Sequence, residues 1–250
     1  MKISLLTVSF NSAATLRDTI KSVRAQDYPD IEYIVVDGQS TDGTVDLIRA
    51  EAAAIDRWIS EPDQGIYDAM NKAIGLATGD VVGILNSDDF YAGTDVVSRV
   101  ARAFEDPTLD AVFGDLTVVD PSNLSRVVRR YSSARWRPEK FARGFMPAHP
   151  TFFVRRKYYE QLGVFKTDYR IAADYELLIR FLYVHRLKYR YLPIHMVTMR
   201  KGGVSSRGIR SNFILNAEII RACRENGIRT NVFKVYPRYF VKLFELFNPA

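Results

Sequence analysis

An apolar run of strand length leads directly into an acidic cluster in the stretch Val81-Val82-Gly83-Ile84-Leu85-Asn86-Ser87-Asp88-Asp89. Two similar runs precede it, from Ile3 to Val8 and from Ile31 to Val36. Helical periodicity fills the intervals, at residues 13–26, 44–54 and 66–77. Short apolar runs that alternate with amphipathic helices predict a mostly parallel sheet with helices on both faces, which is the α/β fold class.

The pattern changes after residue 107, where shorter strands joined by tight turns are expected at 110–114, 116–119 and 126–131. Later helices are expected at 173–185, 211–226 and 236–247. We therefore expect one domain over residues 1–205, divided into a first half at 1–107 and an α+β half at 108–205. Residues 206–250 are expected to form a helical tail.

The bulk composition is that of a soluble globular protein of 250 residues, with 47% hydrophobic residues and a net charge of +6. The charge suits polyanionic partners, which could be nucleic acid, an anionic membrane or a phosphorylated small molecule. Cys223 is the single cysteine, which excludes an intrachain disulfide and predicts a buried structural thiol. No apolar segment approaches the roughly 20 residues that span a bilayer. We expect a cytoplasmic protein.

Polar side chains follow each expected strand of the first half. They are Thr7, Ser9 and Asn11 after the first strand, Asp37 after the second, Asp63 after an edge strand at 58–60, and Asn86 to Asp89 after the fourth. Because ligands bind beyond the carboxyl ends of parallel strands, we expect these side chains to gather on one rim. Local alternatives remain, since Asp37 could shape an Asx turn and Asp88 or Asp89 could cap the next helix.

The adjacent carboxylates of Asp88 and Asp89 repel each other unless a cation lies beside them. Hard carboxylate oxygens with open positions suit Mg²⁺ or Mn²⁺ that also binds a diphosphate. No G-x-G-x-x-G follows the first strand and no G-x-x-x-x-G-K-[ST] occurs in the chain, which argues against a dehydrogenase or a P-loop enzyme. The residues therefore favour a metal-assisted diphosphate site without a glycine-rich phosphate loop.

Four segments, taken in order, resemble the inverting family 2 glycosyltransferases with a GT-A fold, which include bacterial polysaccharide and O-antigen sugar transferases. The resemblance covers about residues 1–205 and is carried by Thr7-Val8-Ser9-Phe10-Asn11, by Val35 to Thr44, by Ser60 to Lys72 and by Leu85 to Asp89. It implies transfer of a sugar from a UDP-, GDP- or dTDP-sugar to a saccharide or lipid-linked hydroxyl. The implied setting is bacterial surface polysaccharide synthesis.

The resemblance also implies roles for the rim residues. The nucleotide would contact Thr7, Ser9, Asn11, Asp37 and Asp63, with Asn86 and Ser87 beside the donor. The metal motif of the family is usually Asp-x-Asp, and here Asn86 replaces the first acid. Metal ligation by Mn²⁺ or Mg²⁺ is therefore expected to depend on Asp88, with Asp89 in support.

The family carries an acidic general base in its second half, and the matching segment here is Ala172-Ala173-Asp174-Tyr175-Glu176-Leu177. Asp174 is the expected base, which would take the acceptor proton during direct displacement. The local alternative is a helix N-cap, and Glu176 is expected to be structural or to contact the acceptor.

Two further segments suit contacts to the substrates. His149 resembles a residue near the active site of a bacterial subgroup and could contact the diphosphate or the acceptor; the alternative is a structural histidine. Arg200 and Lys201 precede Gly202 and Gly203, which suits a loop that closes over a leaving diphosphate. The alternative for this segment is a basic surface turn.

An aromatic stripe marks the helix expected at the C-terminus. Its members are Tyr236, Tyr239, Phe240, Leu243, Phe244 and Phe247. With nearby basic residues, such a helix could lie on the inner face of an anionic membrane, or it could pack on the domain or a second subunit.

Two rival functions fit less well. A sugar-phosphate nucleotidyltransferase would show a glycine-rich, basic loop where this chain has Ser9-Phe10-Asn11-Ser12. A nucleic-acid-binding module is supported only by the charge and the Arg and Tyr content, and we expect no nucleic-acid partner.

Overall fold

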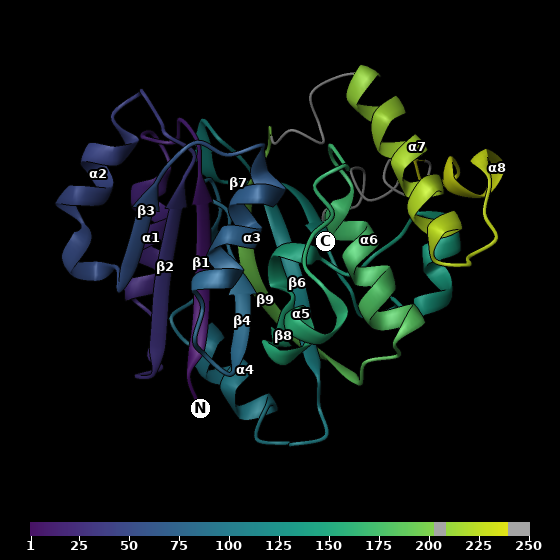
Figure 1. Ribbon diagram of the computed structural model, residues 1–250, viewed down its shortest axis with the longest axis horizontal. Coiled ribbons are helices and arrows are strands. Elements are labelled where there is room, and N and C mark those ends of the chain that lie inside the picture. The colour runs from purple at the N-terminus through teal and green to yellow at the C-terminus, as the bar shows by residue number, and fades with distance from the viewer. Residues whose placement is uncertain (203–208, 240–250) are drawn as a thin grey trace.

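The computed structural model describes residues 1–202 and 209–239, with side chains in the second segment from residue 211 onward (Figure 1). In these residues nine strands form one sheet in the order β3-β2-β1-β4-β8-β6-β9-β5, and β7 pairs with β6. The strands are β1 (Ile3–Ser9), β2 (Ile31–Asp37), β3 (Arg57–Ser60), β4 (Val81–Ile84), β5 (Phe90–Tyr91), β6 (Ala111–Asp120), β7 (Asn123–Tyr131), β8 (Phe153–Arg155) and β9 (Tyr189–Arg200).

The first half has the expected parallel architecture. β1 pairs in parallel with β2 and β4, and β2 pairs in parallel with β3, so the strands run β3-β2-β1-β4. Ser9 lies opposite Asp37, and Asp37 lies opposite Ser60, so three strand ends meet in register. The predicted rim is therefore a feature of the sheet itself.

Helices cover both faces of this sheet, as predicted. Leu6, Val8 and Val36 pack with α3, whereas Leu5 and Val35 pack with α1 and α4 on the opposite face. Alternate residues of one strand thus enter different cores, as the strand period of two requires. The first-half helices are α1 (Leu16–Arg24), α2 (Thr44–Ala50), the 3-10 turn η1 (Ala52–Ala54), α3 (Ile66–Leu76) and α4 (Val96–Ala103).

The second half differs from the expectation in its strands. The two strands expected at 110–114 and 116–119 are one strand, β6, whose register with β9 shifts around Asp115. β6 and β9 run parallel, while β8 lies antiparallel to β4 and joins the halves into one sheet. The helical elements of the second half are η2 (Pro138–Arg143), η3 (His149–Thr151), α5 (Lys157–Leu162), α6 (Ala173–Ile179) and the π-helix η4 (Arg180–Val184).

The described part of the C-terminal region packs on the second half. α7 (Ile209–Glu225) buries Ile219, Ala222 and Cys223 in the same core as α6, and α8 (Val232–Val235) follows it. The prediction of a buried thiol is confirmed. The division at residue 206 stays a prediction. Most of the helix expected at 236–247 lies outside the described residues.

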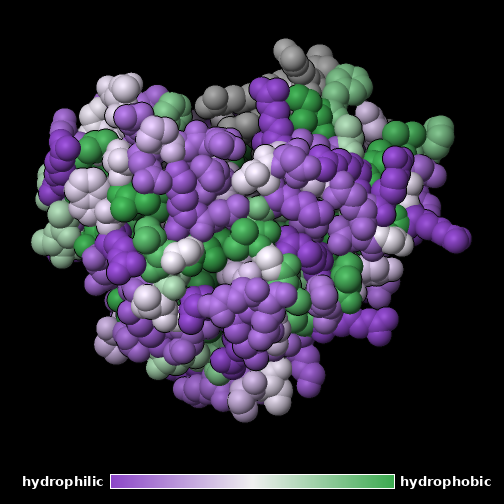
Figure 2. Space-filling model, in the orientation of Figure 1, coloured by the Kyte–Doolittle hydropathy of each residue, from purple (hydrophilic) through white to green (hydrophobic). Residues whose placement is uncertain are grey.

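The surface near α7 and α8 carries exposed hydrophobic side chains, chief among them Phe213 at 63% and Phe233 at 85% exposure. On the face drawn in Figure 2, hydrophilic residues predominate, and hydrophobic ones gather in the central hollow and over these helices. Among the described helices, none has the length and apolar character needed to cross a bilayer.

Candidate functional site

Asp37 is the centre of the rim formed by the ends of β1, β2 and β3. Its Oδ1 accepts from the Ser9 hydroxyl at 3.1 Å and from the Ser40 hydroxyl at 2.5 Å. Its Oδ2 accepts from the Ser60 hydroxyl at 2.7 Å and from the backbone N–H of Ser40 at 2.9 Å. The side chain is fully buried. Asp37 therefore connects the ends of three strands. The buried Ser9 hydroxyl donates to Asp37 and does not face solvent.

The loop after β1 is tied to the loop after β2. Asn11 has a positive φ of 48°, its Oδ1 accepts from the Thr41 N–H at 3.0 Å, and its own N–H donates to the Ser40 hydroxyl at 2.8 Å. Asn11 is exposed. Thr7 does not reach this rim, because it is fully buried and its hydroxyl accepts from Tyr33 at 3.1 Å.

Asp63 lies against the backbone of Gly38. A Cβ at Gly38 would stand 2.3 Å from the Asp63 carboxylate and 3.3 Å from the ring of Phe10, so a larger residue here would require the Asp63 side chain to move. Phe10 is 64% exposed, and sequence reasoning assigned it no role. The sequence feature that could have identified Phe10 is a large aromatic residue directly after a strand, in a loop of polar residues. An exposed ring beside a carboxylate offers a surface on which a planar base can stack.

The acidic cluster forms a tight turn in which the N–H of Asp89 donates to the Asn86 carbonyl at 3.0 Å. The Ser87 hydroxyl lies 2.8 Å from that of Ser12, which ties the turn to the loop after β1. Asp88 is half-buried. Asp89 is only 1% exposed, and burial together with the Asp88 charge raises its pKa well above the usual range. The buried Asp89 Oδ1 has no hydrogen-bond partner in the described chain, and metal ligation by Asp89 stays a prediction.

Arg200 holds this turn from the end of β9. Its guanidinium donates to the Asp88 carbonyl at 2.7 Å and to the carboxylate of Asp18 on α1, and it lies 5.1 Å from the centre of the Phe90 ring. The side chain is 8% exposed. The expected role of Arg200 as a mobile diphosphate ligand does not fit this arrangement. The Lys201 side chain is exposed, and residues 203–206 of the expected loop lie outside the described residues.

The groups around Asp88 fit a divalent ion that shares its coordination with a substrate. Across residues 1–202 and 211–239, no three His, Cys, Asp or Glu side chains cluster closely enough to hold a metal unaided. Mg²⁺ is commonly bound by one or two carboxylates together with substrate phosphates and water. The buried Asn86 Oδ1 has no hydrogen-bond partner in the described chain and is a further oxygen near Asp88.

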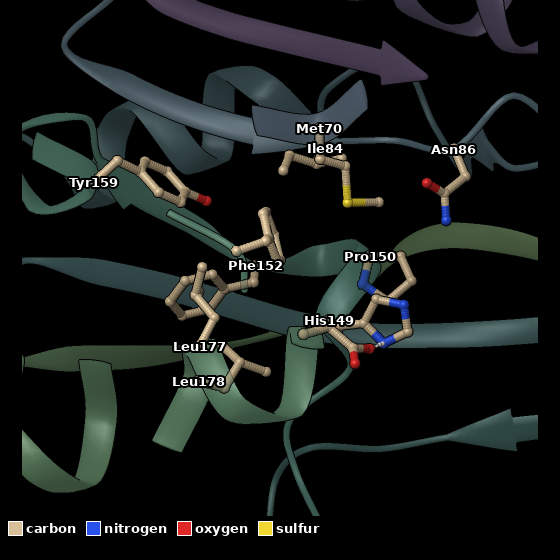
Figure 3. Close-up of a pocket in the computed structure, with 11 residues that line it drawn as sticks. Met70, Ile84, Asn86, His149, Pro150, Phe152, Tyr159, Leu177 and Leu178 are labelled. Carbon is tan, nitrogen blue, oxygen red and sulfur yellow. Dashed lines mark ion pairs between the residues drawn. The ribbon is translucent and has the colours of Figure 1, made fainter. Parts of the chain in front are cut away.

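A cavity of about 40 Å³ joins the acidic cluster to the second half. Asn86 and His149 lie at one end of the cavity, and Tyr159 and Leu177 lie toward the other (Figure 3). Asp174 and Phe165 also line it. His149 Nδ1 lies 3.2 Å from Asp174 Oδ2, and these side chains are 37% and 16% exposed. The sequence placed His149 and Asp174 in separate segments, and the structure brings them into contact. The N-cap residue of α6 is Ala172, which makes no side-chain cap, and Asp174 Oδ1 accepts from the backbone N–H of Tyr175 at 2.8 Å in the first turn of the helix.

Glu176 is structural. It is fully buried on α6, where its carboxylate pairs with Arg180 at 3.0 Å and with Lys166 at 3.1 Å. Loss of one partner from such a buried pair is costly because it leaves a charge uncompensated. Glu176 therefore stabilises the helix that carries Asp174.

Comparison with known proteins identifies the family. Residues 4–163 match the model of glycosyl transferase family 2. An uncharacterized glycosyltransferase of Mycobacterium tuberculosis is 34% identical over 183 residues, which cover 71% of this chain and 68% of that protein. A PGL/p-HBAD biosynthesis glycosyltransferase of Mycobacterium bovis is 31% identical, covering 84% of this chain and 82% of that protein.

Solved structures with a GT-A fold are similar in architecture. A fragment of S. aureus TarS in complex with UDP-GlcNAc has a TM-score of 0.67 at 16% identity, over 92% of this chain and 68% of the fragment. The chain spans 41% of the longer TarS structure. The mannosyltransferase PcManGT of Pyrobaculum calidifontis, in complex with GDP-Man and Mn²⁺, has a TM-score of 0.63 at 23% identity, over 88% of this chain and 61% of that chain. The chain has the GT-A fold and belongs to glycosyl transferase family 2.

Proposed function

We propose that this enzyme transfers a sugar from a nucleoside diphosphate sugar to a hydroxyl of a saccharide or lipid-linked acceptor, with inversion at the anomeric carbon. One observation carries the proposal. Asn86 of the acidic cluster lines the same cavity as His149 and Asp174. A donor diphosphate beside Asp88 would therefore place its sugar near a carboxylate that can accept a proton.

The rim supplies the donor contacts. The exposed ring of Phe10 and the carboxylate of Asp63 border the space above Gly38, where a base and ribose fit. Asn11 adds an exposed amide. Asp37 and Ser9 act indirectly, because their polar groups hold the strand ends together. TarS is described in complex with UDP-GlcNAc and PcManGT with GDP-Man, which supports a nucleotide sugar as the donor.

Asp174 is the proposed general base. Its carboxylate takes the proton from the acceptor hydroxyl while that oxygen bonds to the anomeric carbon and the bond to the diphosphate breaks. His149 contacts Oδ2 of Asp174 and fixes the orientation of the carboxylate. When bound beside Asp88, Mn²⁺ or Mg²⁺ would neutralise charge on the departing diphosphate.

The proposed cellular setting is the inner face of the bacterial cytoplasmic membrane, in the synthesis of surface polysaccharide or glycolipid. The exposed Phe213 and Phe233 beside basic residues support contact with an anionic membrane. The Mycobacterium bovis relative is named a PGL/p-HBAD biosynthesis glycosyltransferase, which supports a role in a biosynthetic glycosylation.

A donor screen tests the function. The protein is incubated with UDP-, GDP- and dTDP-sugars, with Mn²⁺ or Mg²⁺, and with saccharide and lipid-linked acceptors, and release of nucleoside diphosphate is measured. We expect metal-dependent release with one donor class, and NMR of the product shows an inverted anomeric centre. Failure of every donor to bind by calorimetry or to release diphosphate contradicts the proposal, and retention of configuration contradicts the single displacement.

A further inference from the structure

The carboxylate of Glu218 on α7 accepts hydrogen bonds from three consecutive backbone N–H groups. Oε1 accepts from Arg170 at 2.7 Å, and Oε2 accepts from Ile171 at 2.8 Å and from Ala172 at 2.9 Å. These residues lie directly before α6, and Ala172 has no side chain with which to cap the helix. The bonds from Ile171 and Ala172 are partly buried, where an N–H group without a partner is costly, so Glu218 supplies the acceptors that this segment of chain needs.

The same short segment is held from the donor half. The Tyr67 hydroxyl on α3 donates to the Ile171 carbonyl, and Tyr67 is 8% exposed. α3 begins directly after Gly65, at the end of the loop that contains Asp63. The backbone at residues 170–172 is therefore fixed between a helix of the first half and a helix near the C-terminus.

The position of this segment sets the position of Asp174, which is two residues beyond Ala172 in the first turn of α6. A general base must lie within hydrogen-bond reach of the proton it takes, and a displacement of about 1 Å can lower a rate by about 100-fold. We propose that Glu218 is a positioning residue that holds Asp174 at the reacting hydroxyl, an inference that rests on the proposed function.

The inference extends the site beyond the matched family region. Residues 4–163 match the family model, whereas Glu218 lies on α7. Ile219 and Ala222 of α7 are packed in the core with α6, so the helix is fixed against the element that it orients. α7 is thus a component of the acceptor half of the site rather than an appendage.

The test compares two Glu→Gln variants on the same helix. In Glu218→Gln the new –NH₂ group faces backbone N–H donors, so we expect kcat to fall by about 10- to 100-fold while the donor KM stays within about twofold. The control is Glu225→Gln, whose carboxylate accepts from the side chains of Lys166, Tyr169 and Arg221. We expect it to lower the melting temperature but to leave kcat within about threefold of wild type.

A second variant and a second measurement keep the test decisive. Tyr67→Phe removes only the hydroxyl donor and should lower kcat by a smaller factor. Amide hydrogen exchange of the peptide at 170–175 should accelerate in Glu218→Gln and not in Glu225→Gln. Unchanged exchange and a kcat within twofold in Glu218→Gln would overturn the proposal, as would a loss of kcat that merely follows melting temperature in both variants. Absence of transfer by the wild type would instead refute the proposed function, and exchange would still show whether Glu218 holds the segment.

Discussion

Asp37 and Asp174 stand on opposite sides of the site and are held in contrasting ways. Asp37 is fully buried and accepts four hydrogen bonds, all from serine residues. Asp174 is 16% exposed and lines a cavity; its Oδ2 contacts His149 and its Oδ1 accepts one hydrogen bond, from the Tyr175 N–H. A carboxylate whose acceptor sites are filled by neighbours organises structure, whereas one with an open side can exchange a proton with a ligand. Asp37 therefore stabilises the structure of the site, whereas Asp174 is placed to react with a ligand.

Matched Asp→Asn variants give the largest expected effect. Asp174→Asn removes the proton acceptor, and we expect the transfer rate to fall by about 100- to 10,000-fold with little change in stability. Asp37→Asn places an –NH₂ group among serine donors and should cost about 1–3 kcal/mol of unfolding free energy. Turnover measurements and thermal melting separate the effects. A fully active Asp174→Asn protein, or an Asp37→Asn protein with wild-type stability, breaks the comparison.

Asp88 and Asp89 show a similar contrast within one turn, because Asp88 is half-buried and Asp89 is fully buried. Substitutions at these two residues are expected to have the next largest effect on transfer. Asp88→Ala should lower transfer by about 10- to 100-fold and raise the Mn²⁺ concentration needed for half-maximal rate. Asp89→Asn is nearly isosteric and its side chain is buried, so its metal requirement should stay within about threefold of wild type. Metal titrations of diphosphate release measure both. Equal losses in the two variants would show that Asp89 also ligates the ion.

A pair of Gly→Ala variants gives the smallest effect and examines the donor side alone. Gly38→Ala puts a methyl group 2.3 Å from the Asp63 carboxylate, which must move, so the donor Kd should rise by about tenfold. Gly75→Ala on α3 meets no atom within 4 Å and should raise stability by about 0.5–1 kcal/mol without altering the Kd. The donor Kd of both variants is measured by calorimetry with the donor that the screen identifies. An unchanged Kd in Gly38→Ala would remove Asp63 from the donor site.

Local patterns predicted the first half well because its strands and helices are short, regular and consecutive. The strands β1 to β4 and the helices on both faces follow directly from periodicity, and confirmed family membership agrees with the motifs that follow those strands. α1 is shorter than its expected range, and the helix expected at 44–54 ends at Ala50 before a 3-10 turn.

The second half was harder to predict because its regularity depends on pairing partners. β9 was missed since Pro193 interrupts its pattern, and the register with β6 shifts between Phe113 and Asp115, opposite that proline. α5 and β8 are too short to show a clear period.

The site roles that the sequence did not reveal depend on contacts through space. Asp37 could be placed at a strand end, but its enclosure requires serines from three separate segments. Glu218 reads as one charged residue on an amphipathic helix, and no local signal connects it with residues 170–172. Arg200 looked mobile beside two glycines, while its actual partners lie 112 and 182 residues away in the chain.

The contacts of Arg200 bear on how the protein is made. Asp18 is synthesised early, Asp88 follows, and the guanidinium that joins them arrives only at residue 200. Because domains form as the chain emerges from the ribosome, the acidic turn must wait for β9 to be translated and paired before it is secured. Nascent chains stalled before residue 200 should therefore retain a folded first half whose acidic turn is still open to proteases.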